Sequence, residues 1–189
     1  MKKLIVWILL FADTSLFAQQ KFEKELRVPE SEVPVRALDF AESLCPDSRL
    51  KWYKETGLSS KSFEAKTKYQ GKKYSVEFSL NGELEDVEVE VKSKELSNSL
   101  LKSIDDQFDV DFQKHRLKKI QIQYSGIEPD VLQFFSQSLG IDRLQINYEV
   151  VVSAKKGETF GFYEYLFSSR GRLLKKSEII LKMTDNIIY

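Results

Sequence analysis

The stretch KYSVEFSLNGELEDVEV, residues 73–89, decides the fold. Apolar and polar residues alternate on both sides of Asn81-Gly82, and this period of two predicts paired strands with one buried face and one solvated face. The Asn-Gly pair predicts a two-residue hairpin turn, because such turns need positive φ angles. The stretch therefore indicates an antiparallel β-hairpin.

A second stretch, YEYLFSSRGRLL at residues 163–174, repeats this hairpin without a gap. Five aligned positions carry the same residue type: Tyr74 and Tyr163, Phe78 and Phe167, Ser79 and Ser168, Gly82 and Gly171, Leu84 and Leu173. Apolar residues at helical spacing also occur twice, in residues 33–45 and 96–108. The chain therefore contains one structural unit in two copies.

Each predicted helix is followed by four strand-like runs. In the first copy they cover residues 50–55, 62–69, 73–80 and 84–91, and in the second copy residues 117–124, 143–154, 159–167 and 172–181. We therefore predict an α+β protein of two tandem helix-plus-four-strand antiparallel units. We expect one long curved sheet with the helices packed on one face.

The predicted domain boundaries follow from these runs. Residues 1–18 form a signal peptide, residues 19–30 a polar leader, residues 31–93 the first unit and residues 94–189 the second unit. The second unit is longer because residues 127–140 are inserted, and they predict an extra short helix with Pro129 near its start and Gly140 at its end.

The first residues have the layout of a secretory signal: Lys2 and Lys3, a short apolar run, and the small residue Ala18, after which we expect cleavage. The apolar run is shorter than the roughly 20 residues of a membrane-spanning helix, so we expect no stable membrane anchor after cleavage. An exported protein, periplasmic or secreted, is the prediction.

Composition excludes several classes of function. Of 29 basic and 29 acidic residues, residues 1–18 hold two lysines and one aspartate, so 27 and 28 remain in the mature chain. This balance argues against a nucleic-acid partner. Cys45 is the single cysteine, so no internal disulfide can form, and we expect its side chain to be buried on a helix.

The segments VPVRALDF (residues 33–40), LKW (50–52) and YQGKKYSVEFSLNGELEDVEVEV (69–91) together resemble the PepSY-like family, also described as β-lactamase-inhibitor-like. The resemblance covers nearly the whole mature chain and implies an exported bacterial protein of the Bacteroidetes type. The second unit departs from the pattern through its helical insertion and through Arg170 before Gly171. The family resemblance implies a non-enzymatic module, of a protein-binding or inhibitory kind.

No pattern of reactive residues predicts an enzyme. His115 is the single histidine and lies among basic residues before a strand, so we interpret it as a solvated side chain. One histidine and one cysteine cannot form a Cys/His metal site, and no calcium-loop, phosphate-loop or nucleophile-elbow motif is present. We therefore predict no catalytic residues, no metal and no cofactor.

The segment TFGFYEYLF, residues 159–167, suggests a site. The repeat places Tyr163 and Tyr165 on the buried side, so Phe160 and Phe162 must face the side that is polar in the first unit. An apolar patch there needs a cover. We favour the inserted helix as that cover; the alternative is a recognition surface for a partner.

The predicted function is the binding of a protein or peptide in the bacterial envelope. The candidate contacts are Phe160, Phe162, Tyr53 and an exposed ridge at Glu88 and Glu90. We expect Trp52 to lie in the core instead. Two alternatives remain open: a module that senses a small ligand or ion, which needs a pocket lined by aromatic residues, and a degenerate enzyme, which needs converging carboxylates. The sequence leaves the oligomeric state open.

Overall fold

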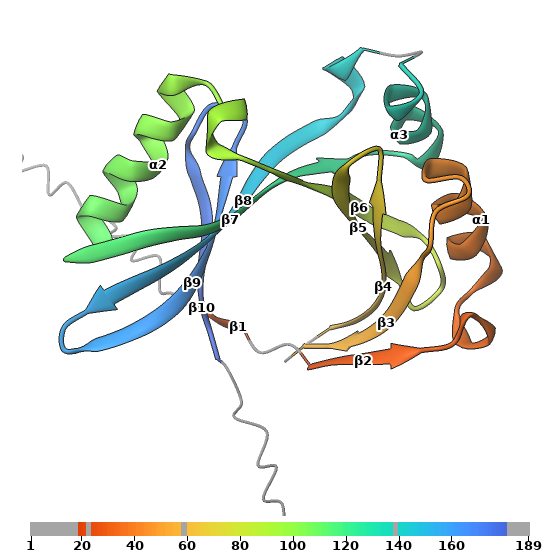
Figure 1. Ribbon diagram of the computed structural model, residues 1–189, viewed down its shortest axis with the longest axis horizontal. Coiled ribbons are helices and arrows are strands. Elements are labelled where there is room, and N and C mark those ends of the chain that lie inside the picture. Colours follow the sequence, from red (N-terminus) through yellow and green to blue (C-terminus); the bar gives the residue numbers. More distant parts are fainter. Residues whose placement is uncertain (1–18, 22–23, 58–59, 138–139, 181–189) are drawn as a thin grey trace, which may run out of the picture.

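One ten-stranded sheet organises the computed structural model, which describes residues 19–21, 24–57, 60–137 and 140–180 (Figure 1). Its strand order is β1-β10-β9-β8-β7-β6-β5-β4-β3-β2. All neighbours pair antiparallel except β1 and β10, which are parallel. The strands are β1 (Gln19–Lys21), β2 (Lys24–Val28), β3 (Lys51–Thr56), β4 (Lys61–Tyr69), β5 (Lys72–Ser79), β6 (Leu84–Val91), β7 (Lys114–Ser125), β8 (Gln145–Lys156), β9 (Thr159–Ser168) and β10 (Leu173–Ile179).

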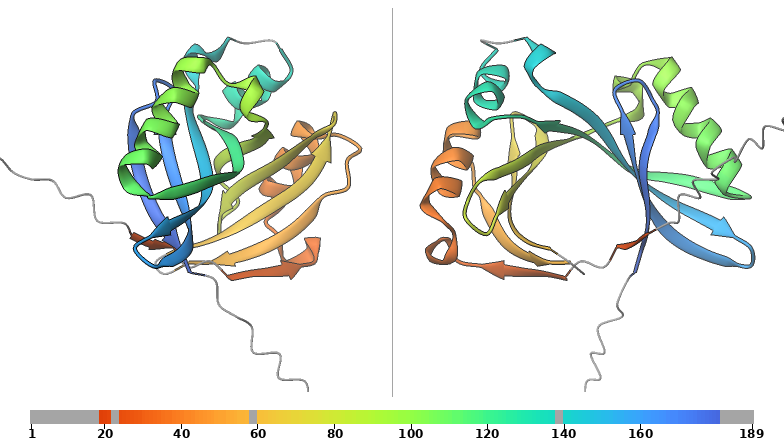
Figure 2. Two further views of the ribbon diagram at one scale, coloured as in Figure 1. Left: turned by 60° about the vertical axis from the view of Figure 1, so that its left-hand side comes forward. Right: turned by 180° about the vertical axis from the view of Figure 1, so that it is seen from behind.

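Two tandem units build this sheet, as predicted. The helix α1 (Val35–Leu44) precedes β3 to β6, and the helix α2 (Asn98–Asp111) precedes β7 to β10. A third helix, α3 (Glu128–Phe135), follows β7 at the predicted insertion. All three helices described here lie on the outer, convex face of the sheet (Figures 1 and 2). The three short 3₁₀ helices are Glu30–Glu32, Ser93–Glu95 and Ile141–Arg143.

The helix α1 forms the first core. Its buried residues are Ala37, Phe40, Ala41 and Leu44, which recur every three or four positions and so share one face. The Phe40 ring meets the Phe78 ring edge-on at 5.8 Å, and the Trp52 ring also lies 5.8 Å from the Phe78 ring. Trp52 is 2% exposed, so the prediction that it belongs to the core is confirmed.

The helix α2 forms the second core in the same way. The Ser97 side chain caps it by accepting a hydrogen bond from the Leu100 backbone N–H. The Phe108 ring, which is fully buried, packs edge-on against Tyr165 and Phe167 at 5.1 and 6.3 Å between ring centres. Each helix therefore covers the inward aromatic residues of its own hairpin.

The turn at Asn81-Gly82 differs from the prediction. Only Gly82 has positive φ, and the backbone N–H of Ser79 bonds to the carbonyl of Glu83, which makes a three-residue loop. The two-residue primed turn lies instead at Gln70-Gly71, where φ is 48° and 81°. The prediction of a hairpin was right, but the turn type was wrong because a glycine at the end of a three-residue loop gives the same sequence signal.

The inserted helix does not cover Phe160 and Phe162. The rings of Phe134 and Phe135 in α3 pack on Tyr124 at 5.2 and 5.1 Å, on the outer face beside α1. Because Tyr124 points toward the first core, α3 joins that core and leaves the opposite face open. The interpretation that we favoured for this helix was therefore wrong.

The polar leader contributes two strands that the sequence did not predict. The strand β1 lies at one edge of the sheet and β2 at the other, although only two residues separate them along the chain. Three Cα steps span at most about 11 Å. The two edges of the sheet must therefore come close together, which curls the sheet nearly into a ring (Figure 1).

This curl changes the face opposite the helices, which we call the inner face. The pairing register places every buried polar residue of the described chain there: Glu55, Glu64, Ser75, Asp86, Glu88, Gln121, Asn147, Glu149 and Ser177. The alternation in the first unit predicted a solvated face for Ser75, Asp86 and Glu88. That prediction was wrong because side chains on the concave side of a curled sheet crowd one another and exclude water.

Candidate binding site on the inner face

A cavity of about 550 Å³ opens on the inner face over strands β3 to β7. It is lined by Arg49, Lys51, Glu64, Lys66, Thr67, Lys68, Lys73, Tyr74, Ser75, Glu88, Glu90, Lys119 and Gln121. A volume of this size is within the usual range of ligand sites, roughly 300–1,000 Å³. Most ligand sites are lined mainly by apolar side chains, whereas most of the residues that line this cavity are charged.

Positive charge dominates this lining. Six cationic side chains face three carboxylates. Lys73 pairs with Glu90 at 3.0 Å, Lys66 pairs with Glu64 at 2.8 Å, and Lys119 lies 3.6 Å from Glu149. Arg49, Lys51 and Lys68 have no ion pair with any residue that the structure describes. The cavity therefore carries a net positive charge.

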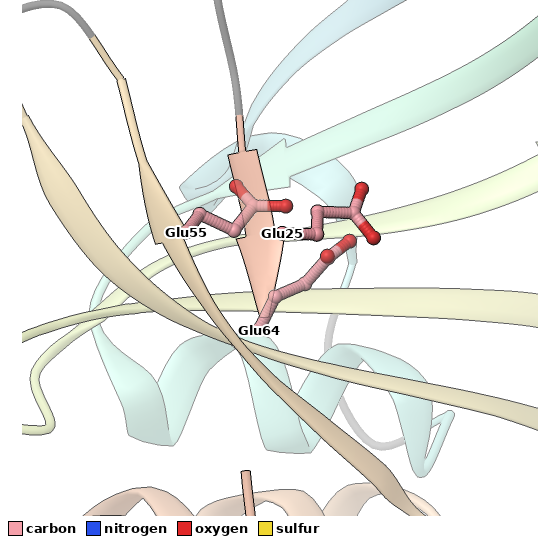
Figure 3. Close-up of side chains that lie close together, drawn as sticks. All are labelled: Glu25, Glu55 and Glu64. Carbon is pink, nitrogen blue, oxygen red and sulfur yellow. The ribbon is translucent and has the colours of Figure 1, made fainter. Parts of the chain in front are cut away.

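A network around Glu64 forms one wall. Oxygens of Glu25, Glu55 and Glu64 lie within 4.8 Å of one another, a grouping that could hold a metal ion (Figure 3). The Lys66 ammonium, however, lies 2.9 Å from Glu25 and 2.8 Å from Glu64 and supplies a positive charge to this group. These three carboxylates therefore give no reason to infer a metal.

The same network sets the protonation of its members. Burial raises the pKa of Glu64, but hydrogen bonds from Glu55, Lys66 and Ser75 outweigh it and hold this pKa below its usual value. The pKa of Lys66 is raised: burial lowers it, and the hydrogen bonds to Glu25 and Glu64 more than compensate. Glu64 and Lys66 are therefore a charged pair at neutral pH, with Glu64 buried and Lys66 partly exposed.

Deeper on the inner face, burial raises the pKa values of the carboxyl groups instead. Burial, followed by the charge of Glu149, raises the pKa of Asp86 to about 7 and raises that of Glu88 well above its usual value. Burial and Glu149 also raise the pKa of Glu164, although the Lys21 ammonium is only 2.7 Å away. Burial and the neighbouring carboxylates therefore favour the protonated, uncharged form of Glu88.

Two polar atoms of the described residues on this face lack both a hydrogen bond and an ion pair; a third, Glu64 Oε2, lacks a hydrogen bond but lies 2.8 Å from the Lys66 ammonium. Within the described part of the chain, neither Gln121 Oε1 nor Asp86 Oδ1 has a hydrogen bond, although the two residues are only 6% and 9% exposed. Gln121 lines the cavity. Such buried orphans are uncommon in native proteins, because each costs free energy. A ligand in the cavity would be able to satisfy the Gln121 amide.

The structure divides the predicted contact residues into two groups on one face. Glu88 and Glu90 line the cavity, and the Tyr53 ring lies beside it, 5.2 Å from the Lys66 ammonium. Phe160 and Phe162 lie on β9, outside the cavity lining. The exposed ridge that we predicted at Glu88 is wrong, because Glu88 is 7% exposed.

Sequence reasoning missed the cations of this cavity. Lysines at alternate positions across the β4–β5 turn, in KTKYQGKK at residues 66–73, were the available signal. The register pairs Lys51 with Lys66 and Lys68 with Lys73. The pairing of Lys51 with Lys66 could not be predicted without knowing where β3 begins. Gln121 was missed for a different reason: its burial depends on the curl of the sheet, which the alternation of residues does not report.

Two other predicted side chains have structural roles. Cys45 is buried at the end of α1, as predicted, and burial raises its pKa to about 12, so the thiol is protonated at neutral pH. His115 lies 2.9 Å from Asp109 and packs on the Phe108 ring. Both side chains lie on the helix side, away from the cavity.

Comparisons with known proteins show the fold. No family model matches this sequence, and neither does any curated protein. A protein of Bacteroides eggerthii considered to be periplasmic superposes with a TM-score of 0.52 at 12% identity, over 77% of this chain and 88% of that chain. A DUF2874 family protein of Bacteroides uniformis gives 0.52 at 11% identity, over 77% and 89%. At these identities the likeness shows the fold alone.

A BLIP-like protein of Bacteroides fragilis is also similar, with 18% identity, a TM-score of 0.49 and coverage of 86% of this chain and 94% of that chain. The predicted α+β class with an antiparallel sheet is confirmed. Among the residues that the structure describes, no helix has the length and apolar character needed to span a membrane. The predicted signal peptide, residues 1–18, lies outside the described residues.

Proposed function

We propose that this protein is an exported, non-enzymatic binding module that holds a segment of an envelope protein or peptide on the inner face of its curled sheet. The observation that carries the proposal is the buried polar cavity, in which the amide oxygen of Gln121 lacks a partner and burial raises the pKa of Glu88. In a protein selected for stability alone, we would expect these buried polar groups to be hydrogen-bonded or replaced by apolar side chains.

Exposed aromatic residues extend the proposed surface. Phe160 is 68% exposed and Phe162 is half-buried, and both lie on the inner face, which none of the described helices covers. Aromatic side chains on a rigid sheet commonly form the energetic centre of protein interfaces. Phe160, Phe162, Tyr53 and the cavity together form an extended surface, which suits a peptide segment better than a small molecule.

Binding there would act by occlusion. The sheet is rigid and its inner face is preformed, so a bound segment loses its freedom while the protein changes little. If that segment belongs to the active site of an enzyme, inhibition follows from steric blocking alone. The resemblance of the chain to inhibitor-like proteins is consistent with this role, and its export follows from the predicted signal peptide and from the similar protein considered periplasmic.

A second candidate function rests on a second cavity. A pocket of about 350 Å³ lies between the ends of α1 and α3, lined by Ser43, Leu44, Pro46, Tyr69, Gln70, Tyr74, Leu132, Phe135, Ser136 and Gln137. Tyr74 meets Tyr69 and Phe135 edge-on at 6.2 and 5.9 Å. This pocket is the kind of aromatic site that a small-ligand sensor requires. A thermal-shift screen against metabolites tests it, and a ligand effect lost on Tyr74→Ala would support it.

Affinity capture from the bacterial envelope tests the main proposal, with the mature chain from Gln19 as bait. The test variant is Phe160→Ser/Phe162→Ser on the inner face. The matched control is Val35→Ser/Val110→Ser, which removes two exposed apolar side chains from the outer helices. A protein held by the wild type and the control, and lost by the test variant, would support the proposal. A protein held equally by all three would contradict it.

A further inference from the structure

Two pairs of lysines lie directly opposite one another at the cavity. Lys51 of β3 faces Lys66 of β4, and Lys68 of β4 faces Lys73 of β5. Like charges in directly opposed positions destabilise a sheet. The four lysines occupy the same inner face, because the positions alternate along β4 and pair across it.

The protein neutralises only one lysine of each pair. Lys66 has Glu25 and Glu64, and Lys73 has Glu90. Lys51 and Lys68 are exposed, and neither forms an ion pair with the described residues. Arg49 adds a third cation without such a partner at the same rim. The cavity therefore has three cations arranged around an opening that already holds hydrogen-bonding groups.

The floor of the cavity fits an anion as well. Gln121 supplies an amide, which can present either its oxygen or its N–H₂ group, whereas the Ser75 hydroxyl already donates its hydrogen bond to Glu64. Glu88 adds no negative charge while it is protonated. An incoming carboxylate would thus meet cations at the rim and, with the Gln121 amide turned toward it, one N–H₂ group below.

We infer that this cavity binds an acidic segment of the partner, with an aspartate or glutamate side chain entering between Lys51, Lys68 and Arg49. The inference rests on the proposed function and specifies the chemistry of its partner. A peptide segment fits better than a free anion, because the inner face continues past the cavity to Tyr53 and to the exposed Phe160.

The test uses a fluorescently labelled peptide with a run of glutamates between glycines and serines. The comparison peptide has glutamines in place of the glutamates, and inorganic phosphate is titrated separately. The protein variants are Lys51→Gln/Lys68→Gln in the cavity and Lys94→Gln/Lys102→Gln outside its lining, in the 3₁₀ helix Ser93–Glu95 and in α2. Both variants have the same net charge, so a difference between them reports position and not total charge.

The wild type should bind the glutamate peptide in preference to the glutamine peptide. The cavity variant should lose about tenfold in affinity and the outer variant less than about twofold, since exposed charges away from the site are screened. Equal losses in the two variants, or equal binding of both peptides, would overturn the inference. Lysine-dependent binding of phosphate without binding of the glutamate peptide would overturn it too, in favour of a small anion.

The two proposals can fail separately. If envelope capture identifies an inner-face partner whose contact segment is not acidic, and the cavity variant still holds it, this inference fails and the proposed function stands. If every inner-face variant still captures the same protein as the wild type, the proposed function itself fails. Each variant should unfold cooperatively at the melting temperature of the wild type. This control shows that a lost signal reports a loss of binding and not a loss of folding.

Discussion

Gly82 and Gly171 occupy the same position in the two halves of the protein. Each closes a hairpin loop with positive φ, 80° and 76°, and each lies directly under its helix. A Cβ atom on Gly82 would lie 2.7 Å from Pro34 Cβ, and one on Gly171 would lie 2.8 Å from Ser103 Cβ. The repeated glycine therefore serves both the turn and the packing of helix on hairpin.

Replacing Gly82 with alanine should destabilise the protein by about 2–3 kcal/mol, because left-handed backbone strain adds to a clash with the start of α1. The control is Gly71→Ala, which has the same positive φ but nothing within 4 Å of its Cβ. It should cost only about 1 kcal/mol. Urea unfolding measures both, and equal losses would show that the contact with Pro34 contributes nothing.

Acidification should stabilise the protein in the window between pH 8 and pH 6. The raised pKa values of Asp86, Glu88 and Glu164 mean that the native state holds protons that the unfolded chain releases, so stability falls as pH rises through these values. With a pKa of about 7, Asp86 alone should contribute about 1 kcal/mol over this window. Below the usual carboxyl range, Glu64 and Asp111 act in the opposite sense because their pKa values are lowered.

The variant Asp86→Asn tests the source of this pH dependence. Asparagine keeps an acceptor for the hydrogen bond from Gln123 and removes the buried charge. We expect it to raise the free energy of unfolding at pH 8 and to flatten the slope between pH 8 and pH 6, both measured by urea titration. If the slope of the free energy of unfolding against pH does not change, Asp86 does not change its protonation between pH 6 and pH 8.

Substitution of Phe160 by serine should leave the melting temperature nearly unchanged, because the side chain is mostly exposed. The contrast is Phe167→Ser on the same strand, whose ring is fully buried under α2 and whose loss should cost about 3–5 kcal/mol. Thermal unfolding distinguishes them. A large loss of stability for Phe160→Ser would mean that this residue belongs to a core.

Periodicity predicted the fold well because local alternation and helical spacing report which side of an element is buried. The four strands of the first unit were predicted within a residue or two, and Trp52 was placed in the core. The turn at Gly82 and the position of α3 were not predicted correctly. The turn was wrong because a three-residue loop that ends in glycine gives the same sequence signal as a two-residue turn. The position of α3 was wrong because its packing depends on contacts distant along the chain, such as that of Phe135 with Tyr124.

The site was less predictable than the fold, because it arises from the curl of the sheet. Nothing in the alternation of β6 distinguishes a solvated Glu88 from a buried one. The curl depends on β1 and β2, which come from a leader without strand-like alternation. Tyr53 and Glu90 were placed on the correct face, whereas the unpaired Lys51 and Lys68 emerged only from the pairing of β3, β4 and β5.

Photo-crosslinking tests the central claim, binding on the inner face, most directly. The crosslinking residue p-benzoylphenylalanine would replace Tyr53 or Phe160 on the inner face, and Val110, 80% exposed, on the outer side of α2. After irradiation with envelope extract, we predict that Tyr53 and Phe160 positions crosslink the same protein and that the Val110 position does not. Crosslinks from the Val110 position alone, or different proteins at the two inner positions, would contradict the account.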